Sequence, residues 1–342
     1  MIRIINPLEH PDWNNAIFSY PGASFFHTYA WAKVLQMSYH YKPLYLTMEG
    51  NGNMAILPVM EVNSSLTGKR GVSLPFTDYC EPIVYDDEQF EKILTYVTDY
   101  GKKNGWKYIE IRGGQKFLDK NEPSECYFGH NLDMTKGADK IFSNFRNSTK
   151  RNIKKAEKEG ANCEVEYSLN ALDEFYRLNS LTRRDHGLPS QPYYFFKNIY
   201  NEIISKRMGF ISIAKYKGIV IAGNVYLHHG ENVIFKYGAS DKIYHHLRPN
   251  NLVMWEAIKW CCEKGYKNLC FGKTETDNEG LRQYKSGWGT QEYIIKYFKY
   301  DFSKDYFAKD PLKMSAFQRK IFSKLPIPVL KGIGNLLYKH MG

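Results

Sequence analysis

A one-sided cluster of basic residues is the first feature of this sequence that could bind a charged substrate. Residues 145–160 read FRNSTKRNIKKAEKEG, and each residue of a helix over 148–159 would turn by about 100°. The basic side chains of that helix would then fall within about 140° of arc. They are Lys150, Arg151, Lys154, Lys155 and Lys158. Asn147 or Ser148 can cap the start of the helix, and Gly160 can end it.

The lysine-rich face favours contact with phosphate groups over the reading of bases. Like charges one helical turn apart repel by roughly a few tenths of a kcal/mol per pair, and a bound anion would offset that repulsion. Arg, Asn and Gln are the usual base-reading side chains, whereas Lys contacts phosphates without base readout. We therefore expect Arg151, Lys154 and Lys155 to hold phosphates of a substrate. The alternative is an ordinary solvated helix.

A second motif combines basic residues with a glycine-flanked tryptophan. The segment FGKTETDNEGLRQYKSGWGTQEY contains Arg282 and Lys285, followed directly by Gly287, Trp288 and Gly289. Two glycines beside a tryptophan indicate a loop where the backbone comes close to a ligand, so we expect Arg282, Gly287, Trp288 and Gly289 to contact substrate. The alternative is a tight turn whose tryptophan is buried as a core anchor. Both interpretations can hold together, with the tryptophan packing and the lysine supplying charge.

Composition narrows the classes of function. The net charge of +11 points to an anionic partner, which could be nucleic acid, anionic lipid or a phosphorylated metabolite, or to a basic surface kept for solubility. The six cysteines form no C-x-x-C pair, and no H-E-x-x-H or Cys/His cluster predicts a metal site. The sequence also lacks a G-x-S-x-G elbow, a Walker A loop and a Rossmann glycine motif.

The ends of the chain carry no segment that predicts membrane insertion. The start, MIRIINPLEHPDW, meets charge and proline too early for a signal peptide, and no run of 18 apolar residues occurs. We expect a cytoplasmic protein with free thiols. Residues 313–342 carry six basic residues and no acid, interleaved with apolar residues. Such a segment can lie on an anionic membrane surface or form a C-terminal helix packed on the body.

The chain contains an internal repeat that predicts two similar α/β domains. GWKYIEI at 105–111 and GYKNLCF at 265–271 share one pattern, and each follows apolar residues at helical spacing. Upstream lie two hairpin signals, YLTMEGNGNMAILPVM around Asn51-Gly52 and ISIAKYKGIVIAGNVYL around Lys217-Gly218. Each half therefore reads hairpin, strand, helix, strand. We expect domains over residues 1–137 and 138–302, with a basic tail over 303–342.

Five motifs in chain order resemble the FemABX-like branch of the GNAT acyltransferase superfamily. Two lie in the first half, FFHTYAW at 25–31 and SLPFTDYCEPI at 73–83. The basic helix resembles the one that opens the family's second domain, and TRRDHGLPSQPYYFF at 182–196 resembles the connection after it. The fifth, YKSGWG within 271–293, resembles the family's Tyr/Phe-Lys-x-Gly-Trp-Gly segment. Together they cover most of residues 20–300.

The resemblance implies a mixed α/β fold with two tandem GNAT-like domains, each a mixed central sheet flanked by helices. It also implies acyl transfer to an amine; the best-known members move an amino acid from aminoacyl-tRNA to a peptidoglycan precursor. Direct transfer from an ester or thioester needs a free amine, a stabilised oxyanion and two positioned substrates. It needs no covalent enzyme intermediate and no tightly bound cofactor.

The absence of a glycine-rich loop indicates which acyl donor to expect. GNAT enzymes hold the pyrophosphate of CoA on a glycine-rich loop, but here that connection is SDKIYHHLRPN at 240–250, without glycine. A pyrophosphate could still meet the start of the next helix at Asn250-Asn251. The missing loop favours aminoacyl-tRNA over acyl-CoA as the donor substrate.

The resemblance also suggests individual roles. Lys285 would stabilise charge at the donor, and Asp78 with Tyr79 would orient or deprotonate the acceptor amine. Asp78 could instead fix a turn after Pro75, and Tyr237 would face the acyl group. The expected acceptor is a UDP- or lipid-linked envelope precursor, handled in the cytoplasm or peripherally at the inner face of the membrane.

Two other functions fit the same residues. One is an acyl-CoA-dependent N-acyltransferase that acts on an amino sugar in surface polysaccharide synthesis. The other is a non-catalytic RNA-binding protein on the same fold, which would need the basic face but neither Lys285 nor Asp78.

Overall fold

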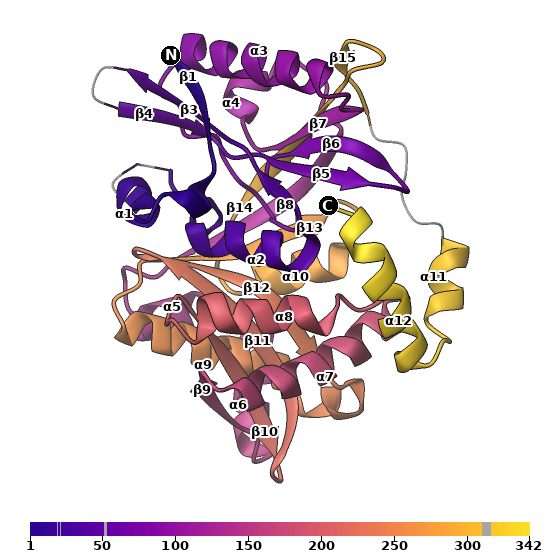
Figure 1. Ribbon diagram of the computed structural model, residues 1–342. Helices are drawn as coiled ribbons and strands as arrows, with labels where there is room; N and C mark the ends of the chain where they lie inside the picture. The colour runs from indigo at the N-terminus through magenta and orange to yellow at the C-terminus, as the bar shows by residue number, and fades with distance from the viewer. Residues whose placement is uncertain (19, 21, 51–52, 310–315) are drawn as a thin grey trace. The chain divides into compact units, whose positions relative to one another are not determined.

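The computed structural model describes residues 1–342 except 19, 21, 51–52 and 310–315. The chain forms two compact units (Figure 1). The first unit comprises Met1–Phe128, Ile294–Leu312 and Leu337–Gly342, and the second comprises Gly129–Tyr293 and Lys313–Leu336. These units are interleaved, whereas the sequence predicts contiguous domains over 1–137 and 138–302 with a tail over 303–342. Strands β8 (Glu125–Asp133) and β14 (Gln291–Asp301) contribute residues to both units.

The first unit contains a main sheet in the order β2-β5-β6-β7-β14 and a small sheet in the order β1-β3-β4. Its strands are β1 (Ile2–Ile5), β2 (Lys42–Pro43), β3 (Tyr45–Gly50), β4 (Asn53–Leu57), β5 (Met60–Ser64), β6 (Gly68–Val72), β7 (Tyr108–Arg112) and β15 (Tyr306–Phe307), which pairs with β14. Its helices are η1 (Pro7–Glu9), α1 (Trp13–Phe18), η2 (Phe25–His27), α2 (Tyr29–Tyr39), α3 (Asp87–Lys103), α4 (Gln115–Leu118) and η5 (Tyr338–His340).

The second unit contains a sheet in the order β13-β12-β11-β10-β9. Its strands are β9 (Asn162–Glu166), β10 (Gly209–Tyr216), β11 (Ile219–His229), β12 (Asn232–Ser240) and β13 (Asn268–Glu275). Its helices are α5 (Ala138–Asn144), α6 (Asn147–Lys158), α7 (Leu169–Asp185), α8 (Tyr193–Ile199), η3 (Tyr200–Ile204), η4 (Lys242–Leu247), α9 (Pro249–Glu263), α10 (Glu279–Ser286), α11 (Ala316–Phe322) and α12 (Ile327–Leu337), whose last residue belongs to the first unit.

The two units share one connection pattern, which confirms the mixed α/β fold. In the first, the antiparallel pair β5–β6 is followed by helix α3 and then β7, which pairs parallel to β6. In the second, the antiparallel pair β11–β12 is followed by α9 and then β13, which pairs parallel to β12. Each helix lies where apolar residues recur at helical spacing, and each covers its sheet with that apolar face.

The two predicted hairpins differ in their place in the fold. Strands β10 and β11 pair antiparallel around a turn in which Lys217 and Gly218 have φ values of 49° and 79°. Two positive φ values are what a tight hairpin turn of this type requires, so this prediction is confirmed. Strands β3 and β4 also pair antiparallel, although the turn residues Asn51 and Gly52 lie outside the described residues. This hairpin belongs to the small sheet, so the halves do not repeat element for element.

Strands β12 and β13 diverge along their length. They pair parallel only over Asn232–Ile234 with Asn268–Cys270, although the strands continue to Ser240 and Glu275. Two backbone irregularities lie just beyond the paired stretch. Lys236 is an extra residue at the register shift between β12 and β11, and Gly272 of β13 has a φ of 68°. The strands therefore separate on the side where β12 ends.

No helix in the described ranges is long and apolar enough to cross a membrane.

Candidate functional site

A cavity of about 300 Å³ opens in the second unit beside the end of β12, with one lining residue from β11 and two from η4. It collects residues from the end of β12, the end of α7, the start of α9 and the inner face of α10. The lining residues are Thr182, Asp185, His186, Asn224, Phe235, Gly238, Ala239, Ser240, Lys242, His245, Asn250, Leu281 and Tyr284. A mostly apolar cavity with a few converging polar groups is the usual form of a small-molecule site.

Several polar side chains of this cavity are held by local contacts. The hydroxyl of Ser240 lies 2.8 Å from Nε2 of His245, and Asp185 accepts a hydrogen bond from the ammonium of Lys242 at 3.2 Å. The side-chain amide of Asn224 donates to the hydroxyl of Tyr226 at 3.0 Å. The cavity therefore offers a carboxylate, a hydroxyl, an imidazole and an amide in fixed positions.

Gly238 keeps the cavity open. A Cβ atom at this position would lie 2.7 Å from the ring of Phe235 and 3.1 Å from Oδ1 of Asn224. Both neighbours line the cavity, so a larger residue at 238 would push them into the space that a ligand needs.

Tyr237, expected to face the acyl group, packs on the other side of β12. Its ring centroid lies 5.3 Å from that of Phe196 and 6.5 Å from that of Phe195, both in α8. The neighbouring residues Phe235 and Gly238 line the cavity instead. The register shift at Lys236 explains why residues 235 and 237 differ in direction, since a bulge interrupts the alternation of a strand.

Lys285 is buried, with only 2% of its surface exposed. It lies in the last turn of α10, and its ammonium donates hydrogen bonds to the carbonyls of Gly272 and Lys273 at 3.0 and 2.9 Å. The positive φ of Gly272 turns its carbonyl toward the lysine side. The preceding residue, Tyr284, lines the cavity and donates to the carbonyl of Asn250 at 3.0 Å. Lys285 thus directly follows a cavity-lining residue of α10, while its own ammonium is held on β13.

Arg282 is engaged by an acidic residue of β14. Its guanidinium donates two hydrogen bonds to Glu292 at 2.8 and 2.7 Å. The same carboxylate lies 3.1 Å from Nε2 of the buried His130. Burial and, next, the nearby charge of Lys285 lower the pKa of His130, while Glu292 works in the opposite direction. Arg282 is therefore placed to hold α10 and β14 together as much as to contact an anion.

The glycine-flanked tryptophan joins the second motif to the basic helix. Trp288 is fully buried, and its ring centroid lies 5.0 Å from that of Phe145 and 5.9 Å from that of Tyr284. The carbonyl of Gly287 accepts hydrogen bonds from the backbone N–H of Arg146 and the hydroxyl of Thr149, at 2.9 and 3.1 Å. A Cβ at position 287 would lie 2.7 Å from that hydroxyl oxygen.

The turn around Trp288 thus fixes the start of α6. Gly289, the other glycine beside this tryptophan, has a φ of 70°, which favours glycine at the end of the turn.

Helix α6 presents the basic face that its sequence predicts. Its buried side chains are Thr149, Ile153 and Ala156. Its exposed basic side chains are Arg151, Lys154, Lys155 and Lys158. No acidic partner for these four occurs within the described part of the chain.

The ends of α6 agree only partly with the sequence. Gly160 follows the last turn with a φ of 83°, as expected of a helix-ending glycine. The prediction that Asn147 or Ser148 caps the start is wrong, because the cap position is Arg146, whose side chain makes no capping hydrogen bond. The Gly287 carbonyl that receives the Arg146 N–H orients the chain there instead.

The start of α9 offers few free donors to a pyrophosphate. Pro249 has no N–H, and the N–H of Asn251 donates to the carbonyl of Arg248 at 3.1 Å. The Asn251 side chain is buried, whereas Asn250 lines the cavity. Of the two asparagines that the sequence suggests for a cofactor, the structure brings one to the cavity.

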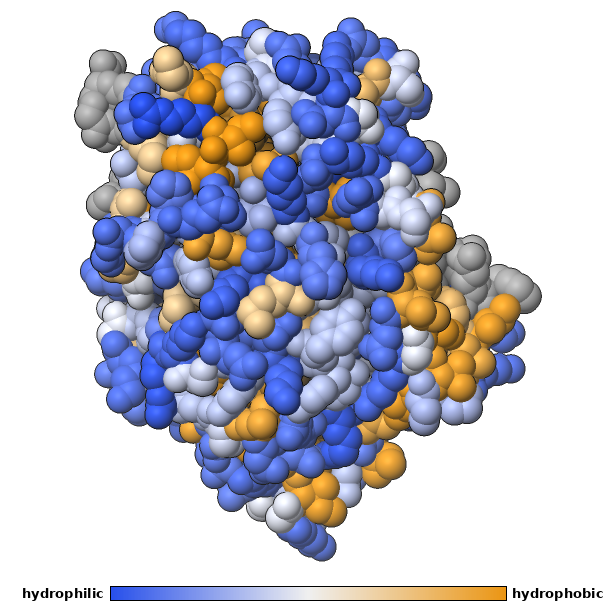
Figure 2. Space-filling model, viewed as in Figure 1, coloured by the Kyte–Doolittle hydropathy of each residue, from blue (hydrophilic) through white to orange (hydrophobic). Residues whose placement is uncertain are grey.

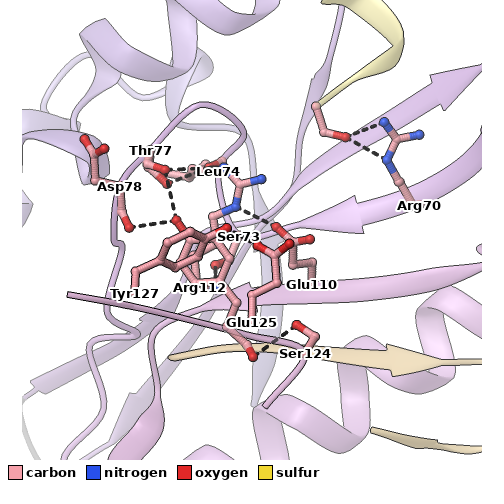
Figure 3. A network of polar contacts seen from close by, with 12 residues as sticks. Arg70, Ser73, Leu74, Thr77, Asp78, Glu110, Arg112, Ser124, Glu125 and Tyr127 are labelled. Carbon is pink, nitrogen blue, oxygen red and sulfur yellow. Dashed lines mark hydrogen bonds and ion pairs between the residues drawn. The ribbon is translucent and has the colours of Figure 1, made fainter. Parts of the chain in front are cut away.

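Asp78 and Tyr79 lie in the first unit, in a strained loop after β6. Leu74 and Phe76 both have positive φ, 62° and 61°, which is rare for residues other than glycine. Such strain persists only where the surroundings over-determine it, and it is frequent at functional sites. Figure 3 shows the carboxylate of Asp78 pointing away from the polar network beneath the loop.

Arg112 is the centre of that network (Figure 3). Its guanidinium donates to Glu110 at 2.6 Å, and its backbone N–H donates to the hydroxyl of Ser73 at 2.7 Å. Burial acts to lower the pKa of Arg112, but the charge and hydrogen bond of Glu110, together with Tyr297 and Tyr127, outweigh it and the pKa is raised. Tyr297 donates to the backbone carbonyl of Asp78 at 2.7 Å. The network therefore fixes the backbone that presents Asp78.

The sequence indicated Lys285 and the basic helix but not most of the cavity. Asn224, Ser240, His245 and Asp185 come from β11, β12, η4 and α7, and only the folding of the second unit brings these elements together. The histidine pair at 245–246 is visible in the sequence, but neighbouring histidines gave no reason to expect one of them beside a serine.

The sequence profile of the acetyltransferase (GNAT) domain family matches residues 143–293, which contain the cavity and both basic motifs. A lipid II:glycine glycyltransferase of Staphylococcus haemolyticus is 32% identical over 85 residues. That match covers 23% of this chain and 20% of the staphylococcal protein, so the chain spans about a fifth of its relative.

Solved structures share the fold over most of the chain. FemX superposes with a TM-score of 0.70 at 15% identity, over 89% of this chain and 98% of FemX. A tandem GNAT protein from the clavulanic acid biosynthesis pathway gives 0.57 at 8% identity, over 88% and 98%. L-PGS from Bacillus licheniformis gives 0.55 at 13% identity, over 91% and 96%. These likenesses confirm the tandem GNAT-like fold.

Proposed function

We propose that the chain is an N-acyltransferase of the FemABX-like branch of the GNAT superfamily, and that it moves an aminoacyl group onto an amine of a cell-envelope precursor. The observation that carries this proposal is the cavity at the end of β12 with its few converging polar groups, next to α10, which carries the buried Lys285. In acyl transfer, fixed positive charge and hydrogen-bond donors near the developing oxyanion lower the barrier.

The cavity suits an aminoacyl donor better than acyl-CoA. An aminoacyl ester carries an α-ammonium group, and the carboxylate of Asp185 lines the cavity where it could receive that charge. The connection that holds the pyrophosphate in CoA-dependent GNAT enzymes is here a 3-10 helix, η4, without glycine. The phosphates of the donor's tRNA would meet Arg151, Lys154 and Lys155 on α6. No tightly bound cofactor takes part.

The transfer proceeds directly, without a covalent enzyme intermediate. Ser240 is the residue to test, because its hydroxyl lies beside His245 in the cavity, as a serine nucleophile beside a general base would. Under direct transfer, Ser240→Ala retains most of its turnover, and no acylated protein accumulates when the donor is mixed with the enzyme alone. Acylation of Ser240 would contradict this part of the proposal.

The acceptor is a phosphorylated envelope precursor. The staphylococcal relative is named for lipid II as its acceptor, and a lipid-linked precursor is the acceptor that we propose here. Asp78, with Tyr79, orients or deprotonates the acceptor amine, a role that the strained and well-fixed loop around it supports. A lipid-linked acceptor places the protein peripherally at the inner face of the membrane.

A ligand screen followed by a transfer assay tests the proposal. Thermal unfolding is measured with CoA, with aminoacyl-tRNA and with UDP-linked and lipid-linked muropeptides, each against the protein alone. We expect stabilisation by aminoacyl-tRNA and by a muropeptide, and transfer of labelled amino acid from one to the other. Stabilisation by CoA alone would refute the tRNA donor and favour transfer to an amino sugar. Binding of tRNA without transfer to any precursor would favour the RNA-binding alternative.

A further inference from the structure

Helices α11 and α12 form a docked part of the second unit. A Cβ at Gly334 of α12 would collide with the carbonyl oxygen of Ser190, and a Cβ at Gly187 would collide with that of Arg319 in α11. Two glycines thus allow close approach of these helices to the segment that follows α7. The surface that the helices present outward is therefore fixed in shape.

Helix α12 is apolar on its outer face as well as on its inner face. Leu330 and Gly334 are buried against the second unit. On the outer face, Val329 is 47% exposed and Leu336 is 68% exposed. In α11, Ile321 is 46% exposed. Figure 2 shows these helices as an apolar area on the right of the view. Apolar side chains exposed together on docked helices indicate a contact surface besides their own domain.

Basic side chains flank this apolar face. In the described part of α11, α12 and the turn between them, the charged residues are all positive. They are Arg319, Lys320, Lys324 and Lys331. Lys331 lies over the ring of Tyr176 at 4.6 Å, and the other three are exposed. No acidic side chain pairs with any of the four within the ranges that the structure describes.

We propose that the outer face of α11 and α12 binds the surface of an anionic lipid bilayer. The apolar side chains would enter the boundary between headgroups and acyl chains, while the lysines contact lipid phosphates. Charge complementarity favours this partner over a protein groove, because an acid-free basic rim matches a uniformly negative surface. It also favours a bilayer over nucleic acid, since exposed Ile321, Val329 and Leu336 gain nothing from contact with phosphates and sugars.

This inference goes beyond the proposed reaction, because binding to lipid requires neither donor nor acceptor. A bilayer contact would hold the protein where a lipid-linked acceptor is found. It would do so through residues that lie outside the cavity lining and outside α6. Failure of lipid binding and failure of acyl transfer are therefore separate results.

Sedimentation of the full chain with vesicles tests the contact. We expect the protein to pellet with vesicles of phosphatidylcholine mixed with phosphatidylglycerol, to stay in solution with phosphatidylcholine alone, and to be released by salt. The double variant Lys320→Glu, Lys324→Glu should weaken partitioning about tenfold or more. Leu336→Ser, at an exposed position, should weaken it about fivefold without a change in melting temperature.

A charge-matched control separates this face from general basicity. Lys136 and Lys140 are exposed in the second unit, on and before α5, and their replacement by Glu makes the same change in net charge. We expect that control to bind vesicles like the unchanged protein. Equal binding to neutral and anionic vesicles, an equal loss in the control, or full binding by the Lys320/Lys324 variant would overturn the proposal. The proposal would also be overturned if the protein bound tRNA through Lys320 and Lys324 and did not bind vesicles.

Discussion

At the residue scale, the burial of Lys285 calls for an explanation beyond packing. Its ammonium is removed from water, and the two acceptors that the structure gives it in β13 are carbonyls, of Gly272 and Lys273, which carry no full charge. Taking a charge out of water costs free energy, which hydrogen bonds to neutral groups offset only in part. A lysine here is therefore costly for the fold, and a role for its charge in transfer explains why the cost is accepted.

Lys285→Met should separate the two roles. The change removes the charge and keeps most of the volume, so we expect the fold to persist with a modest fall in melting temperature, because the carbonyls of Gly272 and Lys273 lose a donor. We expect kcat to fall by about 10²–10³-fold, as when an oxyanion donor is lost, with little change in KM. Lys267→Met, at an exposed lysine paired with Glu231, is the matched control and should keep full activity. Full turnover by the Lys285 variant would show that this lysine only ties α10 to β13.

The sequence predicted which residues carry charge better than it predicted which residues those charged groups contact. Lys285 and Arg282 were both assigned to substrate, yet one is buried with its ammonium on β13 and the other is held by Glu292. That glutamate lies on another element, and the sequence gives no spacing rule that links it to Arg282. Trp288, by contrast, is the buried core anchor that one of the two interpretations predicts. Its ring packs against that of Phe145.

At the element scale, the basic face of α6 carries a prediction about binding. Lys154→Glu combined with Lys155→Glu should raise KM for a phosphorylated substrate about tenfold and leave kcat nearly unchanged, because the face binds phosphates and takes no part in bond making. Both side chains are exposed, and the change relieves repulsion along the helix, so stability should not fall. Steady-state kinetics over a range of salt concentrations measures the effect.

The Lys136/Lys140 double variant again provides the control for net charge. It should keep the KM of the unchanged protein, since these lysines lie outside α6. An equal rise in KM in both variants would mean that substrate senses only the overall charge of the protein, and the phosphate contact assigned to α6 would be wrong.

Helices and hairpins that follow a local sequence pattern were predictable, whereas features that depend on the pairing of distant segments were not. Helices α3, α6 and α9 follow apolar periodicity, and the β10–β11 hairpin follows its Lys217-Gly218 turn. The divergence of β12 from β13 depends on a bulge and on a positive φ at Gly272, neither of which leaves a periodic trace. The separation of the two strands was therefore missed although the strands themselves were found.

At the scale of the whole molecule, neither unit is one continuous stretch of the sequence. Residues 294–312 and 337–342 belong to the first unit although they follow the second in sequence. Within the first unit, β14 pairs antiparallel with β7 over Tyr297–Asp301 and Tyr108–Arg112, a pairing between segments far apart in the chain. Contiguous domain boundaries were the natural expectation, because local patterns contain no information about which distant strand a segment will pair with.

Four histidines of the second unit have lowered pKa values, which predicts a loss of stability in mild acid. Burial lowers the pKa of His130, His186, His228 and His229, so the folded unit resists protonation. The unfolded chain takes up protons near pH 6.5, so the stabilising contribution is complete above that pH. It is lost as the pH falls from there toward the lowered values of the folded state. Glu81, in the first unit, acts oppositely, because burial raises its pKa.

Calorimetry at about pH 7.5 and about pH 5.5 tests this expectation for the second unit. We expect the transition of the second unit to move to lower temperature at the acid pH, by roughly 2–4 °C for each kcal/mol lost. His130→Gln removes one titrating group and should reduce the shift, whereas replacement of the exposed His10, in the first unit, should not. A transition that stays in place or rises at the acid pH would mean that these histidines protonate within the fold, and His130 could then not stay neutral beside Lys285.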